Sequence, residues 1–241
     1  MWPPIIYLSG ATATGKGTLG KKLAANFGLY HVSMGDLRRR YLEKLRAGAP
    51  GIDHDIQQYI VEGKEIPQEL LKRYNTIPAI IQYHNHRAQG LHSWTSQIAS
   101  AMLEEELAEL RAPGQQVGRY KAILIDGHPL TGGVVSQIFV EKYLPIYSGL
   151  TIAIDCPREV CKRRYVERAR VLSENEAKFE TRMALTDKAL PVFLELMASY
   201  GEIVHSTNDD TMTIDDAYNA LVGQLRESRV FFSLTQGQSR A

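Results

Sequence analysis

The chain has 241 residues, of which 44% are hydrophobic, enough for one well-buried α/β core with small appendages. Its 28 Lys and Arg residues almost balance 27 Asp and Glu residues, so charge gives no reason to expect a nucleic acid or an anionic membrane as a partner. No apolar run reaches membrane-spanning length, and a first strand near Ile5 leaves no room for a leader peptide. We therefore expect a cytoplasmic protein.

Short apolar runs that suit buried parallel strands alternate with helical stretches along the chain. The runs cover residues 5–8, 30–32, 122–125, 150–154 and 202–205. Helix signals lie between them: residues 18–27 before Gly28, a basic helix opened by Ser33, residues 158–168 after Pro157, and residues 214–225 capped by Thr213. Such alternation predicts an α/β fold with a five-stranded, doubly wound parallel sheet.

The stretch from residue 67 to residue 120 contains no strand-like run and predicts a helical insert. Its two helical segments lie near residues 68–82 and 93–111. Within the second, residues 104–106 are all glutamates, and we expect a solvated helix face there, with a docking surface as the alternative. Residues 231–241 are polar after Phe232 and are expected to fray. Cys156 and Cys161 have no redox or zinc spacing and are expected to be reduced thiols.

A glycine-rich loop follows the first apolar run and precedes a helix. This strand–loop–helix context indicates a phosphate-binding loop, in which backbone N–H groups and the helix N-terminus hold an anion while Lys16 reaches the outer phosphates of a triphosphate. The predicted binding residues are Gly10, Ala13, Thr14, Gly15, Lys16, Gly17 and Thr18.

The residue after Lys16 is Gly17, and the hydroxyl that usually stands beside the lysine is displaced to Thr18. A direct Mg²⁺ ligand at that position is therefore not expected. Asp126 ends a buried strand at the carboxyl edge of the sheet, where ligands bind. We expect Asp126 to hold Mg²⁺ through water, with a structural cap as the alternative.

Five motifs in one order resemble the nucleoside monophosphate kinases, the adenylate kinase and UMP-CMP kinase family. They are the Gly-Lys-Gly-Thr loop, residues 33–39 (Ser-Met-Gly-Asp-Leu-Arg-Arg), 63–67 (Gly-Lys-Glu-Ile-Pro), 126–129 (Asp-Gly-His-Pro) and 155–157 (Asp-Cys-Pro) followed by Arg164 and Arg168. The resemblance implies a P-loop three-layer fold and an ATP-dependent kinase with Mg²⁺. It divides a single domain, 1–241, into an acceptor-binding segment (33–66), the helical insert (67–120) and a short lid (169–175).

The resemblance also implies roles for individual residues. Arg164 would stack on the ATP base, Arg168 would contact the phosphates, and Arg182 would clamp the transferring group, so Lys16, Arg168 and Arg182 become the catalytic candidates. Without the other motifs, arginines four apart on a helix would suggest only a solvated face. The acceptor-binding candidates are Ser33, Asp36, Arg39, Ile60, Lys64 and Ile66.

The chain departs from the family pattern mainly on the acceptor side. Leu130 stands where the family has an arginine on the acceptor phosphate, and His128 replaces an aromatic residue. In the lid, Arg170 is one residue out of register, and the sequence does not decide whether Arg170 closes over the phosphates. Losing a bidentate guanidinium weakens phosphate binding, so acceptor identity is not fixed by the sequence.

Three functions are compatible with these residues. The first is a nucleoside monophosphate kinase acting on ATP and a nucleoside monophosphate. The second is a kinase of a small hydroxylated metabolite, suggested by Leu130, with Asp36 as its base. The third is a catalytically inactive nucleotide-binding protein that presents its insert to a partner. The oligomeric state stays open, with a monomer as the starting assumption and the insert as a candidate contact.

Overall fold

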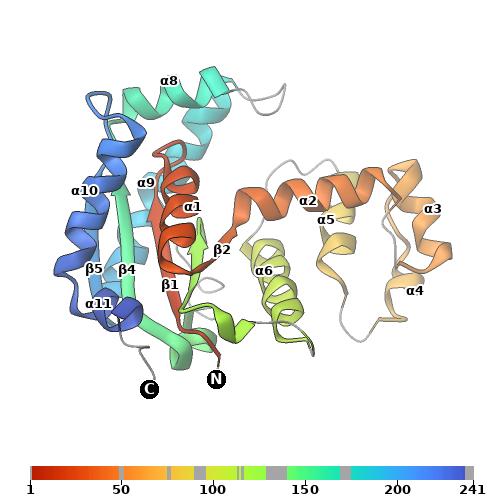
Figure 1. The fold of residues 1–241 in the computed structure, drawn as a ribbon. Helices are drawn as coiled ribbons and strands as arrows, with labels where there is room; N and C mark the ends of the chain where they lie inside the picture. Colours follow the sequence, from red (N-terminus) through yellow and green to blue (C-terminus); the bar gives the residue numbers. More distant parts are fainter. Residues whose placement is uncertain are drawn as a thin grey trace. The chain divides into compact units, whose positions relative to one another are not determined.

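The computed structural model describes residues 2–48, 52–74, 77–89, 96–112, 114, 117–128, 140–168 and 175–236. The chain divides into two compact units, residues 1–33 with 116–241, and residues 34–115. The first unit carries the β-sheet, and the elements described in the second are helices (Figure 1).

The first unit is built on a parallel sheet in the order β2-β3-β1-β4-β5. Its strands are β1 (Ile5–Gly10), β2 (Tyr30–Ser33), β3 (Ile123–Asp126), β4 (Tyr147–Asp155) and β5 (Glu202–Thr207). The five predicted strands and the α/β fold class are therefore confirmed. Because β1 is central, residues 5–8 are buried on both faces, which explains a continuous apolar run instead of an alternating one.

Helices cover both faces of the sheet. On one face, Ile6 and Leu8 share a core with α1 (Lys16–Phe27), α10 (Ile214–Glu227) and α11 (Arg229–Gln236). Successive side chains of a strand point to opposite faces. Tyr7 accordingly packs edge-on against Phe193 of α9 (Glu176–Ala198), with ring centroids 5.9 Å apart. The unit is a three-layer helix–sheet–helix fold, to which α8 (Arg158–Arg168) and the short 3-10 turns Val117–Arg119 and Leu144–Ile146 are added.

The C-terminal part of this unit corrects one expectation and confirms another. Thr213 caps α10 as predicted, in a capping box in which its Oγ1 accepts from the Asp216 N–H at 3.1 Å. The fraying expected from residue 231 onward is wrong as far as residue 236. Phe231 in α11 is only 1% exposed because its ring packs against Phe27, with centroids 4.9 Å apart. Residues 237–241 lie outside the described residues.

The second unit consists of α2 (Met34–Arg46), α3 (His54–Glu62), α4 (Gln68–Leu71), α5 (Ala79–Ala88) and α6 (Ser96–Arg111). The predicted helix over residues 68–82 is wrong, because Pro78 stands at the N-cap of α5, where its missing N–H is tolerated, and cannot continue a helix from α4. The predicted second helix is confirmed as α6. Across the described ranges, no helix is both long and apolar enough to cross a membrane.

The acidic run of α6 is not the solvated face expected from the sequence. Glu106 is 7% exposed, and its carboxylate lies 3.0 Å from the Arg40 guanidinium of α2. Glu105 accepts hydrogen bonds from the Tyr41 hydroxyl and, at 2.5 Å, from the Ala79 N–H at the start of α5. These carboxylates join α6 to its neighbours, since a buried carboxylate needs such partners. They are therefore part of the interior of this unit.

Both cysteines are free thiols, as expected, and one of them is inaccessible. Cys161 on α8 packs with Tyr165 and Phe179, and burial together with the neighbouring Cys156 thiol raises the pKa of Cys161 to about 12. In a Cys156→Ser variant, we expect iodoacetamide at pH 8 to label native Cys161 at least ~100-fold more slowly than the unfolded chain, because the thiolate is the nucleophile. Mass spectrometry of timed samples measures this. Labelling at the unfolded rate would contradict the expectation.

Candidate functional site

The loop from Gly10 to Thr18 joins β1 to α1 and has a backbone that is unusual in three places. Gly10, Ala13 and Gly15 have positive φ angles of 139°, 64° and 94°. A Cβ at Gly10 would lie 2.4 Å from the carbonyl oxygen of Ile154, so this position needs glycine. Strand, loop and helix N-terminus follow each other directly, which is the geometry of a phosphate-binding loop.

The Lys16 side chain folds over this loop. Its Nζ donates to the carbonyl oxygens of Gly10 at 2.8 Å and Ala11 at 2.5 Å, and lies 3.4 Å from Thr14 Oγ1. Burial lowers the pKa of the Lys16 ammonium, while the Asp126 carboxylate acts in the opposite direction. A partly desolvated cation is stabilised by an anion, so a phosphate group would be a favourable partner here.

Asp126 lies beside the first turn of α1. Its side chain is buried, and its Oδ2 is 3.5 Å from the position that a Cβ would take at Gly17. The carboxylate is also 3.6 Å from His31 Nε2. A carboxylate close to the loop supplies the hard oxygen ligand that Mg²⁺ prefers. Thr18, by contrast, is exposed on α1.

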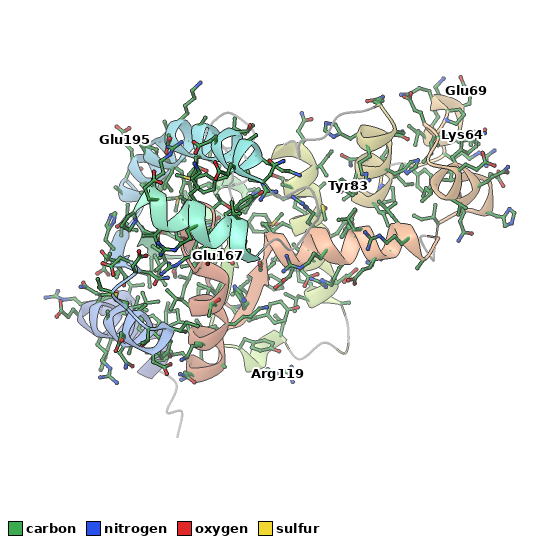
Figure 2. The ribbon with its side chains drawn as sticks, turned by 90° about the horizontal axis from the view of Figure 1, so that it is seen from above. Lys64, Glu69, Tyr83, Arg119, Glu167 and Glu195 are labelled. Atoms are coloured by element: carbon green, nitrogen blue, oxygen red, sulfur yellow. The ribbon has the colours of Figure 1, made fainter. Side chains whose placement is uncertain are left out.

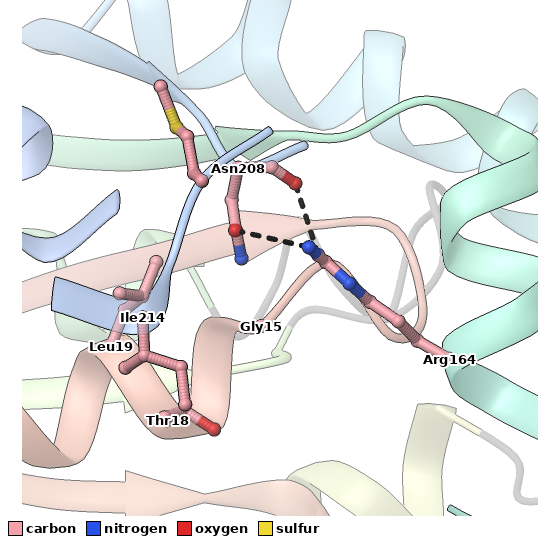
Figure 3. Close-up of a pocket in the computed structure, with 7 residues that line it drawn as sticks. Gly15, Thr18, Leu19, Arg164, Asn208 and Ile214 are labelled. Atoms are coloured by element: carbon pink, nitrogen blue, oxygen red, sulfur yellow. Dashed lines mark hydrogen bonds between the residues drawn. The ribbon is translucent and has the colours of Figure 1, made fainter. Parts of the chain in front are cut away.

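A pocket of about 210 Å³ opens next to the loop, between Gly15 and Arg164 (Figure 3). Its lining combines the loop and α1 with Arg164 of α8 and the segment that follows β5. Arg164 donates to the backbone oxygens of Asn208 at 3.1 Å and Asp209 at 2.7 Å, so its guanidinium is held at the pocket wall. The lining residues are Gly15, Thr18, Leu19, Arg164, Asn208, Met212 and Ile214. An apolar pocket with one fixed guanidinium suits a flat aromatic base.

Arg168 and Arg182 come from different helices and meet at one aromatic ring. Their guanidinium carbons lie 5.2 and 5.3 Å from the ring centroid of Tyr165. Tyr165 is fully buried, and the cluster that contains it includes Ala11 and Ala13 of the loop. The structure thus brings both predicted catalytic arginines together beside the phosphate-binding loop.

The Tyr165 ring contacts both guanidinium groups. Loss of the ring should therefore lower activity more than loss of the hydroxyl group alone. We expect Tyr165→Leu to lower kcat for the reaction proposed below at least ~10-fold, and Tyr165→Phe to keep kcat within about threefold of the wild type. Steady-state kinetics at saturating substrates, with melting temperatures as a check on folding, measure both variants. Equal losses in the two variants would contradict the role of the ring.

The acceptor-side candidates divide between the two units. Ser33 ends β2, in register with Asp126, and belongs to the first unit. The other five belong to the second unit, where Arg39 forms an ion pair with Asp36 on α2. Lys64, labelled in Figure 2, pairs with Glu62 at 2.8 Å. Ile60 and Ile66 are buried in the helical core, with 5% and 1% exposure.

Two of the sequence features lie outside the described residues: Leu130 and the lid residue Arg170. Two residues that sequence reasoning missed are prominent in the structure, namely Asn208 and Tyr165. Asn208 could have been found as a polar residue directly after the last strand, at the carboxyl edge of the sheet. Tyr165 follows Arg164 in an arginine-rich helix, and nothing local signals that it is buried.

The parallel sheet and the loop between β1 and α1 define an α/β protein with a P-loop three-layer fold. No protein-family model matches the chain. Among curated proteins, it is 35% identical to the adenylate kinase of Mycoplasmoides gallisepticum over 85 residues, 35% of this chain and 36% of that protein. It is 24% identical to a probable UMP-CMP kinase 2 of Arabidopsis thaliana over 79% of this chain and 55% of that protein. It is 23% identical to the uridylate kinase of Saccharomyces cerevisiae over 93% of this chain and 91% of that protein.

The match thus spans about a third of the bacterial relative and about half of the plant relative, but nearly all of the yeast relative. The names agree on one family despite the low identity. The chain is thus similar, at low identity, to several nucleoside monophosphate kinases, in agreement with the resemblance of its motifs.

Proposed function

We propose that this protein is an ATP-dependent phosphotransferase that moves the γ-phosphoryl group of ATP to the phosphate of a nucleoside monophosphate. The observation that carries the proposal is the set of cations at the loop: Lys16 over its carbonyl groups, and Arg168 and Arg182 at the Tyr165 ring. Phosphoryl transfer through a loose transition state needs positioning and positive charge, and this set supplies both.

In this proposal each group has one task. The N–H groups of the loop and Lys16 bind the ATP phosphates, and Arg164 orients the base in its pocket. Arg168 and Arg182 stabilise the charge that develops on the transferring group. Asp126 would hold Mg²⁺ through water, and the ion when bound would neutralise charge on the phosphates. A monophosphate acceptor has a second pKa of about 6 and is mostly ionised at neutral pH, so no general base is required.

The test is a coupled assay of the purified protein with ATP, Mg²⁺ and, in turn, AMP, CMP, UMP and dAMP. We expect ADP formation with at least one acceptor, and none above background with Lys16→Met. If none of the four monophosphates gives more turnover with the wild type than with Lys16→Met, the proposal is refuted. Omitting Mg²⁺, or adding EDTA, should abolish the turnover and tests the metal separately.

A kinase of a small hydroxylated metabolite is a second candidate, favoured by Leu130 in place of the family's arginine. Such an acceptor needs a base, and Asp36 is available on α2, where it pairs with Arg39. The two functions rank the variants differently. Asp36→Asn should abolish hydroxyl phosphorylation while Arg39→Ala has a mild effect, whereas a monophosphate acceptor should make Arg39→Ala the more damaging change.

A further inference from the structure

Asn208 follows β5 and contacts both halves of the candidate ATP site. It is 8% exposed, and its own N–H donates to the Asp155 carbonyl at 2.8 Å, which fixes its backbone to the end of β4. Its backbone oxygen accepts from Arg164. Its side-chain Nδ2 donates to the Thr14 carbonyl of the phosphate-binding loop at 2.7 Å, in a fully buried hydrogen bond.

The loop is shaped around this amide. A Cβ at Gly15 would lie 2.3 Å from Asn208 Nδ2, so glycine at this position makes room for the side chain as well as for the positive φ. Figure 3 shows Asn208 beside the Arg164 guanidinium, with dashed lines for the contacts between them. Thr14, whose carbonyl this amide binds, lies between two residues with positive φ, Ala13 and Gly15, immediately before α1 begins.

The two contacts use different parts of the residue. Arg164 is held mainly by backbone oxygens, those of Asn208 and Asp209, and its distance to the side-chain Oδ1 is 3.5 Å. The hydrogen bond from Asn208 to the loop comes from the side-chain amide. Changing the side chain should therefore release the loop and leave Arg164 in place. That separation makes the two effects measurable independently.

We propose that Asn208 is a positioning residue that holds the phosphate-binding loop in its binding-competent shape through the Thr14 carbonyl. This inference rests on the proposed function, because it assumes that the loop binds a triphosphate. A residue that pre-organises a loop raises affinity by increasing the competent fraction of the free protein. The effect should appear with any ligand that uses the loop, whether or not it carries a base.

The experiment compares ATP with inorganic tripolyphosphate, which would occupy the loop without a base, by titration calorimetry of the 241-residue chain. We expect Asn208→Leu and Asn208→Ala to weaken both ligands by a similar factor of about 10, so that the ratio of the two affinities stays within about twofold of the wild type. Arg164→Ala should instead lower the affinity for ATP relative to that for tripolyphosphate, because it weakens the binding of ATP alone. Asp210→Asn, which removes an exposed ion pair to Arg163, serves as the matched control and should change neither.

The outcomes separate this inference from the proposed function. Wild-type protein that binds neither ligand would refute the proposed function and this inference with it. Wild-type protein that binds both, with tripolyphosphate affinity unchanged in the two Asn208 variants, would refute this inference alone. A fall in the affinity ratio like that of Arg164→Ala would also refute it, because the side chain would then act on the base pocket. Leucine and alanine differ in volume, so agreement between them shows that the amide is responsible.

Discussion

Replacing Lys16 with methionine is expected to lower kcat/KM for phosphoryl transfer by at least about a thousandfold, because it removes the ammonium group from the centre of the loop. The same change should abolish the rise in melting temperature that ATP gives the wild type. Methionine keeps most of the length of the side chain, so the loop loses a charge and its hydrogen bonds, but little volume. Kinetics and thermal melts with and without ATP measure both effects.

The unliganded Lys16→Met protein should be no less stable than the wild type. Burial lowers the pKa of Lys16, so the folded state binds this proton more weakly than the unfolded chain does. At neutral pH the charged ammonium therefore opposes folding, an effect that diminishes as the pH rises towards the unfolded pKa. Lys22→Met, which removes an ion pair with exposed Asp215 and a contact with the Tyr218 ring, is the matched control and should keep kcat/KM within about twofold. A large loss of stability in Lys16→Met would contradict this account.

Replacing Arg182 with alanine should lower kcat by about a hundred- to a thousandfold, because in the proposed function its guanidinium stabilises charge that develops in the transition state. Arg182 does not line the base pocket, so the dissociation constant for ATP should change by no more than about threefold. Single-turnover kinetics give the chemical step, and calorimetry gives the affinity.

Arg158→Ala is the matched control for Arg182→Ala. Arg158 begins α8, and its guanidinium pairs with Glu180 at 2.5 Å and Asp187 at 2.9 Å on α9, in a partly exposed position. Exposed ion pairs contribute little to stability, so kcat should stay within about twofold of the wild type. Equal losses in the two variants would show that bridging α8 to α9, and not charge at the loop, is what Arg182 provides.

Features set by neighbouring residues were predictable from the sequence. The phosphate-binding loop, the strands around it and the cap at Thr213 each depend on a few consecutive residues, and the structure has them where they were expected. The chain order of the motifs also predicted the similarity to nucleoside monophosphate kinases. For the donor half of the site, sequence reasoning named Lys16, Arg164, Arg168 and Arg182, which the structure gathers in one unit.

Features set by residues distant in the chain were not predictable. Glu106 reads as exposed in a run of glutamates, and only its packing beside Arg40 of α2 buries it. The sequence suggests that Phe231 begins a polar tail, but in the structure Phe231 packs against Phe27. Asn208 is 194 positions from Thr14, whose carbonyl it binds. Single-sequence patterns carry no information on such pairs, because tertiary packing decides them.

The place of the helical unit in the chain has a consequence for folding kinetics. Strands β2 and β3 pair side by side, yet residues 34–115, the whole of the second unit, lie between them in the sequence. Closing an unstructured loop of that length costs about 4 kcal/mol of chain entropy. If the helical unit folds first within residues 34–115, the effective loop becomes shorter and the sheet can close sooner. Destabilising the helical unit should therefore slow the formation of a sheet that it does not help to build.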